Sequence, residues 1–225
     1  MYNFIIHHMK RKVLTLLATS ITVLIFCSYE TLQPRNEIID EVIIGNQVWM
    51  SRNLDTDTFR NGETIPEARS DEEWMQACKE RKPAWCYYEN KEENGRTYGR
   101  LYNWYAVNDP RQICPPGWRV ASDQDWKTLE NYLGGNSVSA VRMRAKDWEA
   151  IGGSTNSSGF SALPGGLRYK VKMFLYLGKN AYWWTSTPVG TKTAICRQIS
   201  GTDTFVMSRI YDRKQGLSIR CIKDI

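Results

Sequence analysis

The residue types that usually carry enzyme chemistry are thinly distributed in this chain of 225 residues. Its only histidines are His7 and His8, close to the amino terminus. The rest of the chain lacks the residue required for Ser-His-Asp catalysis, Cys-His catalysis and histidine metal sites. Aspartate and glutamate are common, but no pair stands out as a glycosidase-type acid and nucleophile. We therefore expect no catalytic residues, no metal and no cofactor.

Cys27 stands where a covalent modification is expected. It closes an apolar run from Val13 to Phe26 that follows three basic residues at positions 10–12. A run of about 14 residues is too short to cross a bilayer comfortably, and it suits the core of a signal peptide. The stretch "LIFC" is similar to a bacterial lipoprotein box, although Phe26 stands where that box has a small residue. We predict export, lipidation at Cys27 and attachment to a membrane.

Five further cysteines follow the leader, and disulfides persist in exported proteins. Five thiols cannot all pair within one chain, and none forms a Cys-x-x-Cys motif. Cys78 and Cys86 bracket the turn-prone "KERKPAW", and we predict a local bridge between them. A bridge between Cys114 and Cys221 would close a long loop, worth on the order of 4–5 kcal/mol in the chain-entropy model. Cys196 is then expected to be a buried free thiol.

The leader divides the chain into three parts. Residues 1–27 are predicted to be a signal peptide of the lipoprotein type, residues 28–37 a polar tether, and residues 38–225 one domain.

The formal net charge of +6 overstates the charge of the domain, because three of the 30 basic residues belong to the predicted signal peptide. The remaining excess of about three charges is scattered, which argues against a nucleic-acid partner. The expected location is the outer membrane or the cell surface.

Two helices are indicated by their amino-terminal caps. Ser70 precedes three acidic residues, which predicts a short helix ending near Lys79. Ser122 and Asp125 have the spacing of a capping box. Apolar residues follow Asp125 at helical spacing, and Gly134 is predicted to end this second helix.

The rest of the pattern favours short strands and turns. "EVIIGNQVWM" predicts a hairpin around Gly45–Asn46, and Asn94–Gly95 predicts a turn before an aromatic segment. The second half alternates short apolar segments with Gly, Pro, Asn and Lys, which indicates small antiparallel sheets. In "YWWTSTP", Trp183 and Trp184 must point to opposite faces of a strand. At least one of them is expected in the core.

Several motifs, taken in order, resemble the Fibrobacter succinogenes major paralogous domain over about residues 38 to 225. They are "IGNQVWMSRNL", "YGRLYNWYAV", "CPPGWRVASDQDWKTLENYLGG", "GFSALPGGLRY", "YWWTSTP" and "GLSIRCIKD". The family comprises exported proteins, often lipoproteins, of Fibrobacter and Bacteroidetes. The same motifs resemble more distantly the C-type-lectin-like fold and its formylglycine-generating-enzyme branch. The resemblance implies an α+β domain with short helices, small antiparallel sheets and long loops, whose last strand pairs with an early one.

Ligands of the C-type-lectin-like fold usually meet the loops and strands of its second half. The resemblance therefore implies a binding surface there, built from Tyr169, Tyr176, Asn180, Tyr182, Trp184, Asp203, Arg209, Tyr211 and Arg213. The Glu-Pro-Asn and Trp-Asn-Asp motifs of calcium-dependent lectins are absent, and no Asp/Asn cluster offers the six to eight or so oxygen ligands that calcium requires. Sugar binding that does not require calcium remains consistent with the sequence.

Three functions are consistent with the sequence. We favour a non-enzymatic binding or adhesion module whose ligand is a glycan or a cell-surface protein. The first alternative is a structural envelope protein without a soluble ligand. The second is a divergent redox enzyme of the formylglycine-generating type, for which Cys196 and Cys221 are the only late cysteines. The sequence does not indicate an oligomeric state.

Overall fold

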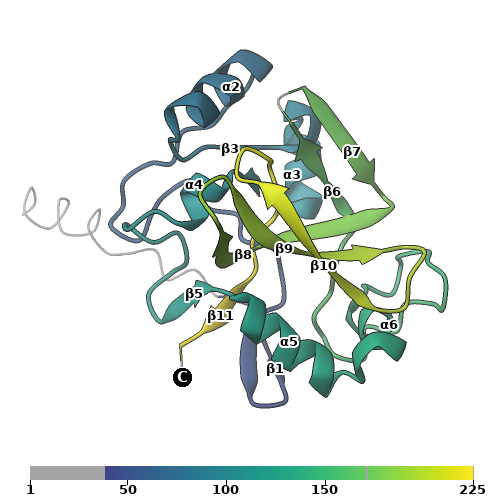
Figure 1. Ribbon diagram of the computed structural model, residues 1–225. Helices are drawn as coiled ribbons and strands as arrows, with labels where there is room; N and C mark the ends of the chain where they lie inside the picture. Colours follow the sequence, from purple (N-terminus) through teal and green to yellow (C-terminus); the bar gives the residue numbers. More distant parts are fainter. Residues whose placement is uncertain (1–38, 171, 225) are drawn as a thin grey trace, which may run out of the picture. The chain divides into compact units, whose positions relative to one another are not determined.

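The computed structural model describes residues 39–170 and 172–224, and Asp40–Ile225 form one compact unit (Figure 1). The predicted signal peptide, the tether and Cys27 lie outside the described residues. Within the described part, no helix is both long enough and apolar enough to span a bilayer.

Helices occupy mainly the first half of the unit and strands its second half, which confirms the predicted α+β class. The helical segments are α2 (Asp71–Glu80), η1 (Tyr88–Asn90), α3 (Glu92–Tyr98), α4 (Trp104–Val107), α5 (Asp123–Tyr132), η2 (Gly135–Ser137) and α6 (Ser139–Met143). The first strands are β1 (Glu41–Ile44), β2 (Gln47–Met50), β3 (Trp85–Cys86), β4 (Leu101–Tyr102) and β5 (Trp118–Val120). The later strands are β6 (Gly165–Tyr169), β7 (Met173–Leu177), β8 (Asn180–Val189), β9 (Thr193–Ser200), β10 (Val206–Asp212) and β11 (Cys221–Lys223).

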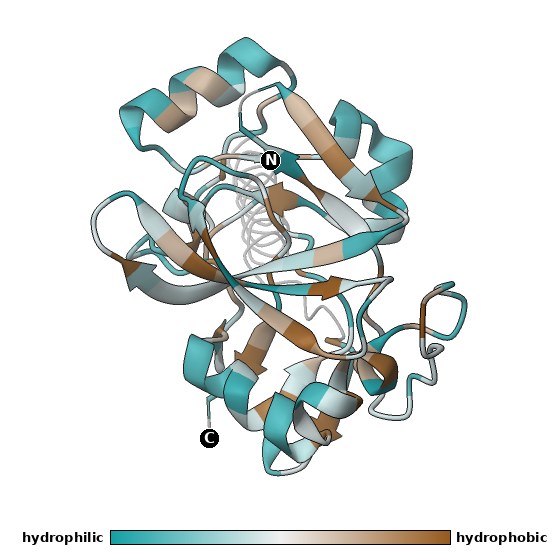
Figure 2. Ribbon diagram, turned by 45° about the vertical axis from the view of Figure 1, so that its right-hand side comes forward, coloured by the Kyte–Doolittle hydropathy of each residue, from teal (hydrophilic) through white to brown (hydrophobic). Residues whose placement is uncertain are grey.

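The strands form one four-stranded, one five-stranded and one two-stranded sheet. The four-stranded sheet has the order β1-β2-β11-β5, so the last strand lies between two early ones and is antiparallel to both. The expected return of the terminal strand is thus confirmed, and the predicted Cys114–Cys221 disulfide joins β11 to the loop before β5. The five-stranded sheet has the order β10-β9-β8-β6-β7. Figure 2 shows hydrophobic colour concentrated on the strands and teal on much of the helical surface.

The predicted hairpin and helix caps are confirmed. β1 and β2 pair around Gly45–Asn46, and Ser70 and Ser122 cap α2 and α5, the latter as a complete capping box with Asp125. The turn predicted at Asn94–Gly95 is wrong, because both residues lie inside α3. Gly95 is needed there for packing, since an added Cβ would lie 2.1 Å from the ring of Tyr87.

The main core is a cluster of aromatic rings between the two larger sheets and α5. Trp49, Trp126, Phe160 and Trp183 contact one another with ring centroids 5.2 to 5.8 Å apart. All four side chains are fully buried. Edge-to-face and tilted ring pairs of this kind are worth about 0.5–1.5 kcal/mol each beyond their area burial. The first tryptophan of "YWWTSTP" is therefore a core residue.

The partly buried amide of Asn53 and the buried guanidinium of Arg220 link this core to both ends of the unit. Asn53 Oδ1 accepts hydrogen bonds from Trp183 Nε1 at 2.8 Å and from Arg220 Nη2 at 3.0 Å. Arg220 Nη1 donates to the backbone oxygens of Met50 and Phe160, both at 2.8 Å. The end of β2, the middle of β8 and the residue before β11 are thereby held at one point.

The predicted Cys78–Cys86 bridge is wrong. Both thiols are free and buried in a second hydrophobic cluster, and the thiol of Cys196 is also free and buried, as expected. Cys78 Sγ on α2 donates to the backbone oxygen of Lys214 at 3.5 Å, whereas Cys86 on β3 lies beside Arg168. The two thiols thus face different neighbours. Burial raises the pKa of Cys78 to about 12 and that of Cys86 to about 11, so both stay protonated and unreactive.

An ion network attaches α5 to β9. Arg197 Nη2 donates to Asp123 Oδ1 at 2.5 Å, and its Nη1 donates to Glu130 Oε1 at 2.7 Å. Burial opposes ionisation of Asp123, but hydrogen bonds and charges from Lys127 and Arg197 outweigh it and lower the pKa. Burial raises the pKa of Glu130 to about 7, because its attraction to Arg197 does not compensate for lost hydration.

Glu130→Gln tests this network through its pH dependence. Between about pH 4.5 and 7 the folded chain holds a proton on Glu130 that the unfolded chain has released, so this residue makes stability fall as pH rises. Urea unfolding should show the variant gaining stability relative to the wild type across this range. Glu92→Gln, whose carboxylate is 69 % exposed, is the control and should show no such trend. A constant difference between Glu130→Gln and wild type would contradict the raised pKa.

Candidate functional site

The two faces of the five-stranded sheet have different surroundings. Ala181, Trp183, Ile199 and Val206 point from one face into the aromatic core. Because side chains alternate along a strand, Tyr182 and its neighbours at every second position point to the other face. This second face is the surface on which the predicted ligand-binding residues of β8 and β10 lie.

A helix covers the second face at one end. Trp184 is fully buried there, under α4, and its Nε1 donates to the backbone oxygen of Tyr102 at 2.9 Å. Trp104 of α4 donates from Nε1 to the backbone oxygen of Thr185 at 2.9 Å, and the guanidinium of Arg213 lies 4.1 Å from the Trp104 ring. Both tryptophans of "YWWTSTP" are therefore buried on opposite faces of β8. The prediction that Trp184 contacts a ligand is wrong, because a helix closes its side of the sheet.

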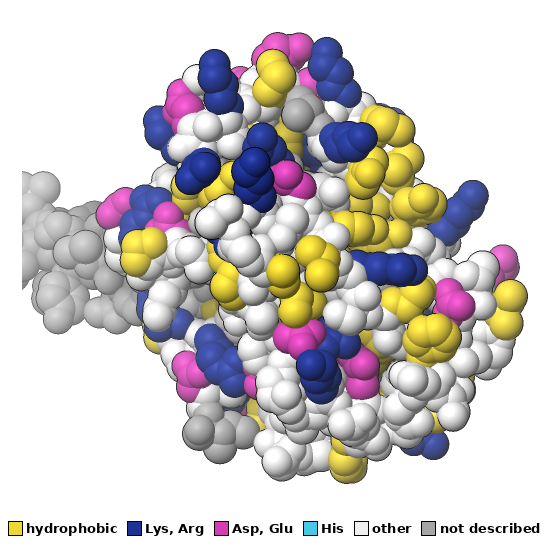
Figure 3. All heavy atoms as spheres, viewed as in Figure 1, with side chains coloured by type: hydrophobic (Ala, Val, Ile, Leu, Met, Phe, Trp, Pro, Cys, Tyr) yellow, Lys and Arg dark blue, Asp and Glu magenta, His cyan; other side chains and the backbone are white. Residues whose placement is uncertain are grey.

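At the other end of this face three tyrosines form a row, which we call the tyrosine ledge: Tyr176 on β7, Tyr182 on β8 and Tyr211 on β10. The ring centroids of Tyr176 and Tyr182 are 6.2 Å apart, and those of Tyr182 and Tyr211 are 6.1 Å apart. Tyr176 is 48 % exposed, Tyr211 is partly exposed and Tyr182 forms the floor at 2 % exposure. Figure 3 shows hydrophobic side chains over β7 and over the middle of the sheet.

Polar groups border the ledge. Asn180 Nδ2 donates to the hydroxyl of Tyr182 at 2.9 Å. Arg209 is exposed, and its Nε donates to Gln198 Oε1 at 3.1 Å across the β9–β10 pair. The ledge thus combines apolar ring surface with amide groups and a guanidinium, which can bind the hydroxyl or carbonyl oxygens of a ligand.

Tyr176 is held in a backbone conformation that is unusual for its type. Its φ is +67°, in the left-handed region that non-glycine residues rarely adopt. The adjacent Gly166 on β6 has a φ of +64°, and a Cβ there would lie 2.6 Å from the backbone oxygen of Leu175. This irregularity at the edge of the sheet places the Tyr176 ring next to Tyr182. Strain of this kind costs about 1–3 kcal/mol and is often retained at functional sites.

Tyr182 and Tyr211 of the ledge are neutral hydrogen-bonding groups. Burial raises the pKa of Tyr182, against the hydrogen bond from Asn180, and burial also raises the pKa of Tyr211. Cys196 lies opposite Arg209 in the β9–β10 register, and burial raises the pKa of its thiol. Protonated phenols and a protonated, buried thiol can bind a ligand but do not provide a base or nucleophile at neutral pH.

The structure brings together five of the nine predicted ligand residues: Tyr176, Asn180, Tyr182, Arg209 and Tyr211. Tyr169 lies at the far end of β6, opposite Met173. Asp203 lies in the β9–β10 turn, where its backbone oxygen accepts a hydrogen bond from Arg144. Arg213 covers Trp104 and bonds the backbone oxygens of Thr193 and Gly190, so its role is structural.

Gln198 and Met207 belong to the border of the ledge and were not predicted from the sequence. Arg209 contacts both side chains, since its Nη2 also approaches Met207 Sδ at 3.1 Å. The alternation of "TAICRQIS" and "DTFVMSRIYD" places them on the face of Tyr182 only if the register between β9 and β10 is known. Sequence alternation alone could not supply that register.

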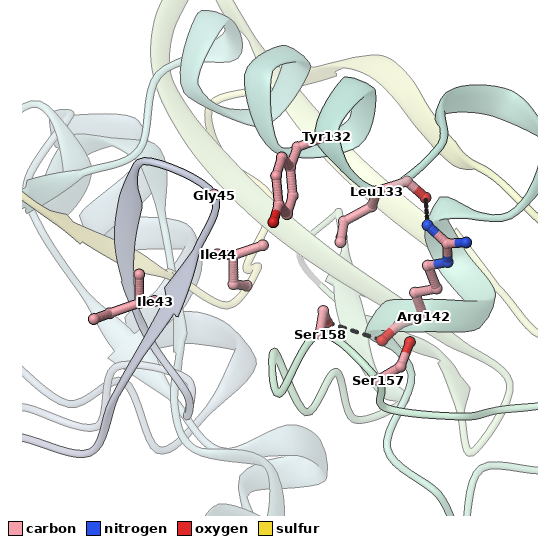
Figure 4. A pocket seen from close by; sticks show the side chains of 8 residues that line it. All are labelled: Ile43, Ile44, Gly45, Tyr132, Leu133, Arg142, Ser157 and Ser158. Carbon is pink, nitrogen blue, oxygen red and sulfur yellow. Dashed lines mark hydrogen bonds between the residues drawn. The ribbon is translucent and has the colours of Figure 1, made fainter.

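A separate shallow groove of about 410 Å³ lies between the β1–β2 turn and the end of α5 (Figure 4). The ring of Tyr132 lies against Gly45, and Arg142 Nη1 donates a hydrogen bond to the backbone oxygen of Leu133 at 3.2 Å. Ile43 is 73 % exposed and Tyr132 64 % exposed beside it. None of the predicted ligand residues lines this groove. Among the described residues no cluster of His, Cys, Asp and Glu is arranged to hold a metal ion.

These features define the class: an α+β domain with a disulfide-fixed terminal strand and a row of tyrosines on one face of its larger sheet. The model of the Fibrobacter succinogenes major domain matches residues 42–223, and the chain belongs to this family. No curated protein and no solved structure gives a significant match to the chain. The family predicted from the motifs is thus confirmed.

The strain at Tyr176 predicts an inverted preference between glycine and alanine. Tyr176→Gly and Tyr176→Ala both remove the ring, but only glycine relaxes the left-handed backbone. We expect Tyr176→Gly to be more stable than Tyr176→Ala by about 1 kcal/mol in urea unfolding. Met173 lies on the same strand with the same 48 % exposure and no positive φ, so its alanine variant should be the more stable one. The same order at both positions would contradict the strained geometry.

Proposed function

We propose that this protein is an exported, lipid-anchored binding module, without enzymatic activity, and that the tyrosine ledge is its ligand-binding surface. The observation that carries the proposal is the ledge itself, in which a strained Tyr176 extends the row of rings formed by Tyr182 and Tyr211. A structural role alone would not explain why a large aromatic side chain, half exposed, occupies a left-handed position that glycine would adopt at lower cost.

The proposed ligand is a glycan. A sugar ring presents an apolar C–H face and a rim of hydroxyl groups. The ledge offers the matching groups: ring faces on Tyr176 and Tyr211, and hydrogen-bonding groups on Asn180 and Arg209, the latter held by the buried Gln198. The ledge is an open surface, whereas sites for small-molecule substrates are generally concave. An extended polymer fits such a surface, and its binding would not depend on calcium.

The redox alternative receives no support from the late cysteines. Cys221 is bonded to Cys114, and Cys196 is buried and free. A redox pair would require these two thiols to reach each other, and the disulfide in β11 already engages one of them. Export and lipid attachment in the proposal rest on the leader sequence, which predicts a signal peptide ending at Cys27.

A glycan array probed with the chain from residue 36 onward tests the proposal. This chain contains the compact unit Asp40–Ile225 with its cores and disulfide. We expect retention of a defined set of glycans, unaffected by EDTA. Tyr176→Ala and Arg209→Ala should each weaken binding about thirtyfold, since central aromatic and arginine contacts are worth about 2 kcal/mol.

Tyr132→Ala is the matched control, because Tyr132 is an exposed tyrosine of the same domain away from the ledge. Its binding should equal that of the wild type. A blank array would reject a glycan as the ligand, and loss of binding with EDTA would reject a calcium-free mode. Equal losses in Tyr132→Ala and Tyr176→Ala would reject the ledge as the binding surface.

A further inference from the structure

The five-stranded sheet has two edges, and they differ in regularity. At one edge, β7 is interrupted by the left-handed Tyr176, which breaks the run of extended residues. At the other edge, β10 pairs with β9 through seven consecutive residues, Val206–Asp212, without a register shift. Irregular edges discourage pairing with another strand, whereas a regular edge is a template for it.

The hydrogen-bonding pattern shows which backbone groups of β10 face outward. Arg213 N donates to the backbone oxygen of Lys192 at 3.0 Å, one position beyond the last register pair, Asp212 and Thr193. In an antiparallel ladder alternate residues bond the partner strand, so the odd-numbered residues of β10 bond β9. The backbone groups of Ser208 and Ile210 then point away from the sheet. No hydrogen bond to these groups is present within residues 39–170 and 172–224.

The side chains of this edge are also open. Ile210 is 59 % exposed, and Ser208 and Arg209 are exposed on either side of the strand. Ile210 lies on the same face of the sheet as the core residue Val206, but Ile210 does not belong to the core cluster. An extended segment with unpaired backbone groups and an exposed β-branched side chain is suited to pairing with another strand.

A second copy of β10 is a complementary occupant in one antiparallel register. With the twofold axis at Ile210, Ile210 of one copy lies opposite Ile210 of the other. Ser208 of each copy then lies opposite Asp212 of the other, and Arg209 of each copy lies opposite Tyr211 of the other. The apolar contact covers exposed isoleucine, and a guanidinium beside an aromatic ring is a favourable pair. The register centred on Arg209 would instead place two arginines opposite each other, which is unfavourable.

We propose that the protein forms a twofold dimer through antiparallel pairing of β10 with β10 of a second copy, centred on Ile210. The twofold axis is perpendicular to the sheet, so both tyrosine ledges lie on the same side of a continuous sheet. Two ledges on one side can engage a repeating ligand together, which raises its apparent affinity without a new contact. The dimer itself does not depend on the identity of any ligand.

Cysteine cross-linking of the chain from residue 36 onward tests the register. In a hydrogen-bonded antiparallel pair the Cα atoms are about 5.5 Å apart, within the range that a disulfide spans. Ile210→Cys should therefore form a disulfide-linked dimer under mild oxidation. Ser208→Cys alone should not, while a mixture of Ser208→Cys and Asp212→Cys should form the mixed dimer. The native free cysteines are buried and do not compete.

Light scattering on the same chain measures the oligomeric state without introduced cysteines. The wild type should associate to a dimer as concentration rises. Ile210→Lys should remain monomeric, because the substitution places two positive charges opposite each other at an exposed position that the fold tolerates. Ile151→Lys, at a residue 63 % exposed in a loop, should dimerise like the wild type.

Three results would overturn the proposal: a wild type that stays monomeric at the highest concentration, a dimer that Ile210→Lys leaves intact, and an Ile210→Cys chain that does not cross-link. Self-linking of Ser208→Cys as fast as Ile210→Cys would reject the register centred on Ile210.

Discussion

The buried guanidinium of Arg220 and the side-chain amide of Asn53 form the contact on which the rest of the fold depends. Arg220 is 1 % exposed, and its hydrogen bonds go to two backbone oxygens and to Asn53, which also accepts from Trp183. Burial lowers the pKa of Arg220 to about 9, so the group is still charged at neutral pH. Removing the Asn53 side chain would leave Nη2 of this buried charge without a hydrogen-bond partner, which is costly in a protein interior. Three family motifs, "MSRNL", "YWWTSTP" and "LSIRC", thus meet at a structural contact.

Because Trp183 points into the core at that contact, its neighbours Tyr182 and Trp184 point to the opposite face of β8. The core side of the strand is anchored to Asn53, and the outer side is closed at Trp184 by α4. At the end near Tyr182, the sheet supplies Tyr176 and Tyr211 from its two edge strands, and these two rings carry the exposed aromatic surface over the buried Tyr182. Tyr182 of the ledge therefore lies on a strand that is anchored on both faces. The strain that the ledge retains is concentrated at Tyr176, a residue that the core does not require.

The sequence predicted local features better than long-range ones. Ser122 and Asp125 predicted their capping box, and Gly45–Asn46 predicted its hairpin, because these signals are complete within a few residues. Five of the nine predicted ligand residues lie together in the structure, because alternation and family resemblance indicated neighbouring strands; their role in binding stays a prediction. Trp184 and Arg213 were misplaced because only the tertiary structure shows that α4 closes that end of the sheet. The bridge predicted between Cys78 and Cys86 failed for a similar reason: closeness in sequence does not show which way a thiol points.

The proposed ligand site is the tyrosine ledge, which shares Tyr182 with the motif "YWWTSTP", while Trp183 and the other motif residues described above build the scaffold. Nitration of tyrosines, mapped by mass spectrometry with and without a bound glycan, tests this directly. Tyr132 and Tyr176 are the exposed tyrosines among the described residues, and only Tyr176 belongs to the ledge. Tyr176 and Tyr132 should both be modified in the free chain, and the buried Tyr182 should not. Bound glycan should protect Tyr176 and leave Tyr132 as reactive as before. Protection of Tyr132 with Tyr176 unchanged would place the ligand in the groove beside Gly45 and contradict the account.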